Sequence, residues 1–123
     1  MNFDFHTGLP TCLTAILSSG LVGYSNTNCD IGGNTHLISD HFTFTDRTEI
    51  LLLRWMQLST FTSVFRTSEG NHPELTLQVY SNAYLAGIFA LYSGIFKILA
   101  PYRKEQIGIS SELKLPLVRP LFL

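Results

Sequence analysis

The sequence predicts an α/β fold, and three stretches indicate it. A short apolar stretch at residues 21–25 leads, through Asp30, into a glycine-rich loop. Residues 49–59 have the apolar spacing of a helix packed on a sheet, and residues 61–65 are β-branched and aromatic, as strands are. A strand that carries a lone carboxylate into a glycine-rich loop is how α/β barrels present polar groups to a ligand. The 123 residues are fewer than the ~200 that a whole (β/α)8 barrel needs, so the chain cannot be a complete barrel.

The composition excludes several classes of protein. Hydrophobic residues make up 46% of the chain and charged residues 14%, which is typical of a globular protein and not of a disordered one. The formal net charge of −1 gives no reason to expect nucleic acid or an acidic membrane surface as a partner. Basic residues are scattered, and only Arg103 and Lys104 are adjacent, so the stripe that follows a phosphate backbone is absent.

The cysteine and histidine pattern predicts neither a metal site nor a cofactor. Cys12 and Cys29 lack the C-x-x-C spacing, and the four histidines are scattered. A disulfide between the two cysteines stays open. Residues 1–20 lack the basic start of a signal peptide, so no export signal is expected and the compartment is left undetermined.

The first elements are a helix and a strand. Residues 11–19 are apolar with small polar breaks, Pro10 suits a first helical turn, and Gly20 is expected to end the helix. Residues 21–25 form the expected strand. Gly32 and Gly33 permit positive φ, so the chain is expected to turn directly after Asp30. By turn chemistry alone, Asp30 is an ordinary turn residue.

The middle of the chain contains the second helix and strand. Residues 37–47 show no period and predict an irregular loop. Asp46 or Thr48 is expected to cap the helix at residues 49–59. The helix carries an apolar stripe in which Trp55 is expected to serve packing, not sugar stacking. That stripe consists of Leu51, Leu52, Trp55 and Leu58.

The last third predicts a long apolar helix. After a loop at residues 69–74 and an extended stretch at 75–80, Ser81 or Asn82 is expected to cap a helix over residues 83–99, which Pro101 stops. Residues 83–96 carry no charge, but 14 residues are fewer than the ~20 that a membrane span needs, so a core helix of a large domain is favoured over a membrane span. Residues 103–123 predict a helix end and then an extended tail.

Five segments together resemble the closing part of the catalytic barrel of glycoside hydrolase family 31, the α-glucosidase family, and in particular its sulfoquinovosidase-like branch. They agree with the family in order and rough spacing over nearly all of the chain. They are DIGGN at 30–34, EILLLRW at 49–55, RTSEGN at 66–71, PYR at 101–103 and RPLFL at 119–123.

The resemblance implies a fold and a place in a larger protein. Residues 1–123 would be the C-terminal segment of a (β/α)8 catalytic domain, truncated at both ends, with about the last two βα units, an additional helix and a tail. Residues 21–25 and 61–65 would be the seventh and eighth strands. Retaining glycosidases need two carboxylates, and the resemblance puts both upstream of Met1. Asp4 comes near the register of the acid/base residue without its sequence context, so this chain would contain no catalytic residue.

Four residues would form part of a sugar-binding wall. Asp30 matches the family's acceptor of sugar hydroxyls, and Arg66 matches an arginine that holds neighbouring carboxylates; its alternative is a solvated arginine at a strand end. Asn34 replaces an aromatic residue, a tyrosine that helps to recognise the sulfonate in the sulfoquinovosidase-like branch. Ser68 replaces a histidine that contacts substrate and cannot supply its ring nitrogen. Both differences weaken the expectation of sulfoquinovose specificity.

Two functions follow from these observations. The first is a fragment of a glycoside hydrolase that hydrolyses O-glycosyl bonds, with an α-glycoside as its ligand and no activity of its own. The second is a degenerate, non-catalytic remnant that packs against the missing part of the barrel or another protein chain. Saturable binding of a sugar would distinguish the first from the second.

Overall fold

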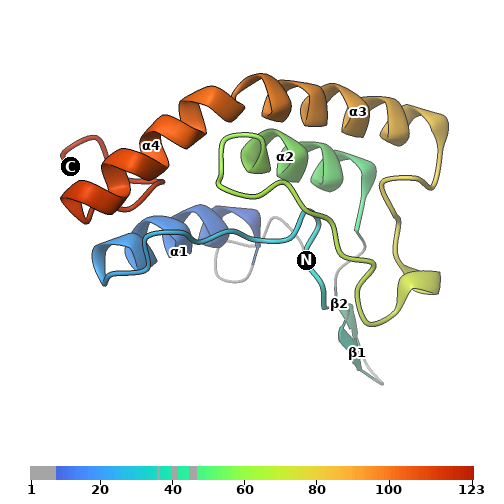
Figure 1. The fold of residues 1–123 in the computed structure, drawn as a ribbon. Helices are drawn as coiled ribbons and strands as arrows, with labels where there is room; N and C mark the ends of the chain where they lie inside the picture. Colours follow the sequence, from blue (N-terminus) through green and yellow to red (C-terminus); the bar gives the residue numbers. More distant parts are fainter. Residues whose placement is uncertain (1–7, 36, 40–41, 45–46) are drawn as a thin grey trace.

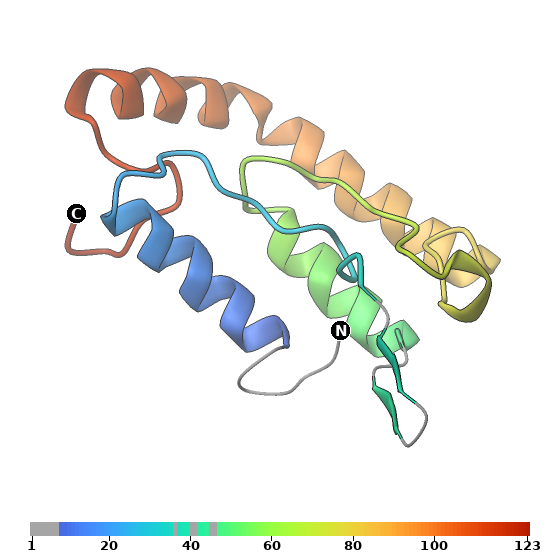
Figure 2. The same ribbon diagram turned by 90° about the horizontal axis from the view of Figure 1, so that it is seen from below.

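The computed structural model describes residues 8–35, 37–39, 42–44 and 47–123 (Figure 1). Four α-helices account for most of it. In both views α2 lies between α1 and α3, and α4 continues from the end of α3 (Figures 1 and 2). The helices are α1 (Leu9–Leu21), α2 (Glu49–Ser59), α3 (Ala83–Ile98) and α4 (Ala100–Leu113), with a short 3₁₀ helix, η1, at Pro73–Leu75.

The helix α1 begins as predicted but ends later. Pro10 lies in its first turn, where the missing amide hydrogen costs no hydrogen bond. Gly20 is buried inside the helix and does not end it, so that prediction was wrong. The turn comes at Gly23, which has a φ of 101°. Gly20 instead accommodates the ring of Pro116, which leaves no room for a side chain.

Neither of the two predicted strands forms in the described chain. Within residues 21–25, Leu21 is the last residue of α1, and a turn follows it. Residues 61–63 form a turn and a bend, 64–65 have no regular structure, and Phe61 is 70% exposed. A strand needs a neighbour that accepts its backbone hydrogen bonds. In the described chain, residues 21–25 and 61–65 form no strand ladder; the one isolated parallel bridge lies beyond both segments, between Ile31 and Thr67.

The strands that are described make a small antiparallel hairpin. Strand β1 (Leu37–Ser39) pairs with β2 (Phe42–Phe44), and Ile38 lies opposite Thr43. The sequence predicted an irregular loop here, and that prediction was wrong for these residues. Asp46, one of the two predicted helix caps, lies outside the described residues.

The helix α2 has the bounds and the cap that the sequence predicts. The Thr48 side chain accepts a hydrogen bond from the amide of Leu51 at 3.3 Å. Trp55 is completely buried, which confirms its packing role. Met56 is buried as well, so the apolar face is wider than predicted, whereas Leu58 is only partly buried.

The helix α3 is capped by Asn82, whose side chain accepts from the amide of Leu85 at 2.8 Å. Leu85 is the one residue of α3 that the described chain buries. The prediction of a core helix concerned a larger domain and stays a prediction. Pro101 lies in the first turn of α4, where proline is favoured, and so begins a second helix 53° off the first. Among the described helices none alone is long and apolar enough to cross a membrane; the bent pair α3–α4 passes that test by length and composition only.

One hydrophobic core joins the first three helices. Its buried members come from one wide face of α2, from the inner faces of α1 and α3, and from two connecting segments. Burying such side chains gives the main favourable free energy of folding. The core residues are Cys12, Ile16, Ile31, Leu51, Leu52, Trp55, Met56, Val79 and Leu85.

Candidate functional site

Asp30 lies at the start of a tight turn that the following glycines make possible. The amide of Gly33 donates to the carbonyl oxygen of Asp30 at 2.8 Å. Gly32 and Gly33 have φ values of 80° and 71°, in the left-handed region that other residues disfavour. A Cβ on Gly32 would also lie 2.8 Å from a methyl carbon of Leu52. The predicted turn directly after Asp30 is therefore confirmed.

The structure brings Asp30 and Arg66 together. The backbone amide of Ile31 donates to the carbonyl oxygen of Arg66 at 2.8 Å, within the parallel bridge to Thr67. Beside it, Nε and Nη2 of Arg66 each lie 2.6 Å from Oδ1 of Asp30. The Arg66 side chain is 63% exposed and that of Asp30 13% exposed. An ion pair at such a surface contributes little to stability, so its main effect is to orient the carboxylate.

Asn34 and Ser68 lie on the same two loops but do not join their side chains across them. The exposed Asn34 side chain accepts from the hydroxyl of Thr35 at 3.0 Å. The Ser68 hydroxyl accepts from the amide of Gly70 at 3.3 Å. The backbone links the loops instead, because the amide of Asn71 donates to the carbonyl oxygen of Asn34 at 3.2 Å.

Arg47 lies beneath both loops and was not predicted as a site residue. Its side chain donates to the carbonyl oxygens of Gly33 and Ser68 and to the side chain of Gln78. Only 7% of Arg47 is exposed, and burial lowers the pKa of its guanidinium. In the sequence, Arg47 is distinguished only by its position just before the Thr48 cap. An arginine at such a position is usually exposed to solvent. Only the fold could reveal this role.

Cys12 and Cys29 adjoin the site as free thiols. A hydrogen bond from the Cys12 thiol lowers the pKa of Cys29 to about 7, against the opposing effects of burial and of the negative charge of Asp30. The same contact, with burial, raises the pKa of Cys12. The described residues contain no group of three or more His, Cys, Asp or Glu side chains that could hold a metal ion.

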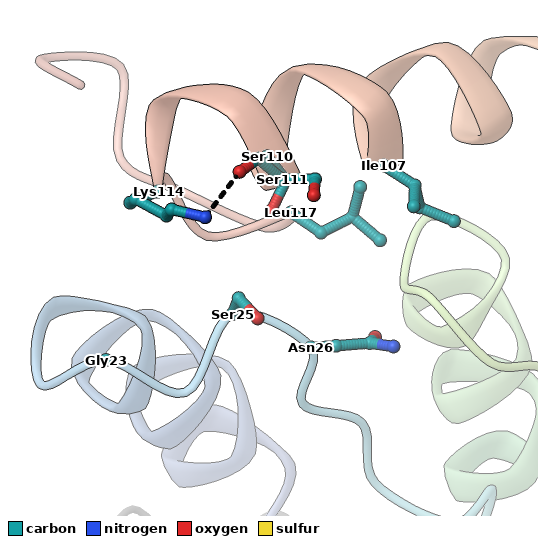
Figure 3. Close-up of a pocket in the computed structure, with 8 residues that line it drawn as sticks. All are labelled: Gly23, Ser25, Asn26, Ile107, Ser110, Ser111, Lys114 and Leu117. Carbon is teal, nitrogen blue, oxygen red and sulfur yellow. Dashed lines mark hydrogen bonds between the residues drawn. The ribbon is translucent and has the colours of Figure 1, made fainter.

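A separate cavity of about 410 Å³ lies between the turn after α1 and the C-terminal part of α4 (Figure 3). Ser25 and Asn26 line one side, and Ser110 and Lys114 line the other. The ammonium group of Lys114 already donates to the carbonyl oxygen of Ser111 at 2.8 Å. None of the four predicted site residues lines this cavity, so it is not the candidate sugar site.

The family of the chain follows from its similarity to known proteins. Residues 6–86 match the TIM-barrel domain of the glycosyl hydrolases family 31. A domain of this class presents its ligand-binding groups on loops such as those of Asp30 and Arg66. The chain belongs to glycosyl hydrolase family 31.

Individual relatives narrow the similarity to one branch. The chain is 39% identical to a sulfoquinovosidase of Agrobacterium fabrum and 36% identical to one of Escherichia coli, over all 123 residues. It spans 18% and 17% of the length of these relatives. A solved structure, a family 31 sulfoquinovosidase from E. rectale in complex with the aza-sugar inhibitor IFGSQ, is similar with a TM-score of 0.84 and 34% identity. That similarity covers 98% of this chain and 17% of the other.

Proposed function

We propose that this chain supplies part of the sugar-binding wall of a glycoside hydrolase that acts on O-glycosyl bonds. In this proposal, residues 1–123 are the C-terminal segment of the (β/α)8 domain, with about its last two βα units. The parallel bridge between Ile31 and Thr67 supports two neighbouring parallel strands at this place, and helix α2 connects them as a βα unit requires. The length of the relatives supports a larger whole.

The Asp30–Arg66 pair carries the proposal. Both Arg66 nitrogens contact Oδ1, and no donor of the described chain reaches Oδ2. The carboxylate is thus held by one oxygen and offers the other to a ligand. A charged acceptor suits a sugar hydroxyl because charge-assisted hydrogen bonds are shorter and stronger than neutral ones. The exposed Arg66 retains donors that face solvent and could meet a ligand oxygen.

The reaction itself would use carboxylates from another part of the polypeptide. A retaining glycosidase needs a nucleophile and an acid/base residue about 5–5.5 Å apart. The resemblance puts both before Met1, and residues 1–123 would then bind the substrate and not react with it. Asn34 and Ser68 would change which sugar is bound, because an exposed amide and a hydroxyl replace an aromatic ring and an imidazole.

The test is sugar binding by the native polypeptide that carries this chain. Two probes are titrated by calorimetry or NMR: the inhibitor IFGSQ and a neutral aza-sugar of the same ring type. We expect saturable binding of at least one, and a Kd that rises roughly 10–100-fold in Asp30→Asn, since a hydrogen bond to a charged group contributes about 1.5–3 kcal/mol. Glu112→Gln, on the exposed surface of α4, is the matched control.

Each outcome of that titration is informative. Unchanged Kd in Glu112→Gln together with weakened binding in Asp30→Asn supports the proposal. Absence of saturable binding to both probes in the wild-type polypeptide contradicts it and leaves the non-catalytic remnant as the better description. Tighter binding of the neutral probe than of IFGSQ would agree with the presence of Asn34 where the sulfoquinovosidase-like branch has a tyrosine.

A further inference from the structure

Arg47 joins three segments that are far apart in the sequence. Its Nη2 donates to the carbonyl oxygen of Gly33 at 2.5 Å, in the loop that follows Asp30. Its Nη1 donates to the carbonyl oxygen of Ser68 at 3.1 Å, in the loop that follows Arg66. Nη1 also lies 3.2 Å from Oε1 of Gln78, in the segment before α3. One guanidinium therefore holds both loops of the candidate sugar site.

The partners of Arg47 indicate that its role is geometric. A buried charge is costly unless it is paired or fully hydrogen-bonded. Every partner that the structure shows for Arg47 is a neutral oxygen, and two of the three are backbone carbonyls. A planar guanidinium fixes the directions of its donors, so it sets the distance between the carbonyls that it holds. A methionine could fill the same space without that cost but could not set this distance.

The glycines around Arg47 show how closely the loops fit it. A Cβ on Gly32 would lie 2.9 Å from Nε of Arg47. A Cβ on Gly70 would lie 3.2 Å from the carbonyl oxygen of Asn34 and 3.5 Å from Nη2 of Arg47. Each loop thus places a glycine with positive φ against the guanidinium. The amide of Asn71 closes the arrangement by donating to the carbonyl oxygen of Asn34.

We infer that Arg47 is a positioning residue that fixes the Asp30 loop and the Arg66 loop relative to each other, so that the ion pair between them is held ready for a sugar. The inference rests on the proposed function. Arg47 itself is buried beneath the loops and acts through the carbonyl groups of Gly33 and Ser68. Gln78 orients it, because Nε2 of Gln78 is held by the carbonyl oxygens of Glu69 and Thr76.

The experiment replaces Arg47 with lysine in the native polypeptide. Lysine keeps the charge, but its ammonium cannot span three acceptors as a guanidinium does. The Kd for IFGSQ and for the neutral aza-sugar is expected to rise roughly 10–100-fold, as small misplacement of binding groups does. Amide hydrogen exchange is expected to accelerate about tenfold or more at Gly33 and Asn71 but not at Thr60 and Leu99, because only the loops lose their support.

A matched control and a second variant complete the test. Arg54→Lys changes an exposed arginine of α2, whose guanidinium donates to Gln57 at 2.8 Å, and should alter neither readout. If Arg47→Lys does not fold, Gly70→Ala is used, since it keeps Arg47 and puts a methyl group 3.2 Å from the carbonyl oxygen of Asn34, where the two loops meet. The same local increase in exchange and loss of affinity are expected for Gly70→Ala.

Three results would overturn the inference. The first is a Kd within twofold of wild type in a folded Arg47→Lys or Gly70→Ala variant. The second is equal acceleration of exchange at Thr60 and Leu99, which would mean that Arg47 only stabilises the whole fold. The third is a wild-type polypeptide that binds neither probe: the proposed function then fails, and the exchange data from the same samples show separately whether Arg47 joins the loops.

Discussion

The ring of Pro116 occupies the space that a side chain on Gly20 would need. A Cβ on Gly20 would lie 2.8 Å from Cβ and 2.9 Å from Cγ of Pro116. These distances are shorter than any normal contact between carbon atoms, and a proline ring cannot rotate away. The C-terminal tail is thus packed directly against the backbone of α1, which is why α1 carries a glycine one residue before its end.

Gly20→Ala is therefore expected to destabilise the protein. Alanine favours a helix by about 1 kcal/mol over glycine, but overpacking costs about 1–3 kcal/mol, and the rigid ring of Pro116 puts the cost toward the upper end. The net change in the free energy of unfolding should be a loss of up to about 2 kcal/mol. Chemical denaturation of the native polypeptide measures it, and an unchanged midpoint would show that the tail does not pack on α1.

Gly87→Ala should have the opposite effect. Gly87 lies inside α3, and a Cβ there would meet no atom within 4 Å. Because no contact is strained, only the helix propensity changes, and stability should rise by about 0.5–1 kcal/mol. The same denaturation experiment tests this, with Gly20→Ala as its counterpart. A loss of stability in Gly87→Ala would mean that another surface packs closely on α3.

The parts of the fold that depend on neighbouring residues were predictable from the sequence. The helix α2 was predicted with its bounds and its cap because the Thr48 side chain bonds an amide only three residues away. Asn82 at the start of α3 is a second example of the same kind. Such contacts join residues only a few positions apart, so the sequence pattern predicts them.

The non-local parts were not predictable from the pattern alone. Ile31 and Thr67 are 36 positions apart, and nothing within residues 61–65 shows that they would lack a strand partner. The sequence predicts a helix end at Gly20 because it does not show that the ring of Pro116 packs against this glycine. Asp30 and Arg66 were each predicted from the family resemblance, but their contact, and the role of Arg47 beneath them, required the three-dimensional arrangement.

Removal of the α2 cap should weaken the protein measurably. In Thr48→Ala the amide of Leu51 loses its side-chain acceptor, and the expected cost is about 1 kcal/mol, within a range of about 0.5–2. Thr48→Asp should restore the stability because aspartate is an equally good cap and also complements the helix dipole.

Thr14→Ala is the matched control for the cap. The Thr14 hydroxyl is exposed on α1 and reaches the carbonyl oxygen of Pro10 only at 3.4 Å. Its removal should change the thermal unfolding midpoint little. Equal losses in Thr14→Ala and Thr48→Ala would show that the cap of α2 has no special effect.

Exposed apolar side chains predict self-association of the 123-residue chain when it is produced alone. Leu121 and Phe122 in the tail are 107% and 78% exposed, and Ile98 at the end of α3 is 76% exposed. Large apolar surfaces of this kind mark contacts with other protein segments or cause aggregation. Sedimentation velocity should show oligomers that the double variant Leu121→Ser, Phe122→Ser reduces. A monomeric wild-type chain with a cooperative thermal transition would refute the prediction.

Cys29 should react as a thiolate near neutral pH. The hydrogen bond from Cys12 lowers its pKa to about 7, and the thiolate is the nucleophile. Alkylation of the folded protein by iodoacetamide should therefore reach half its maximal rate near pH 7. In Cys12→Ala the donor is lost, and the midpoint should move above the ordinary thiol value of about 8.5, because burial and the charge of Asp30 both still raise the pKa of Cys29. Because the folded-state pKa of Cys29 lies below its unfolded-state value, the Cys29 contribution to stability increases as the pH rises from about 7 to that unfolded-state value and is lost as the pH falls through 7. Mass spectrometry of the labelled peptides identifies the reacting cysteine, and equal midpoints in wild type and Cys12→Ala would show that the two thiols do not interact.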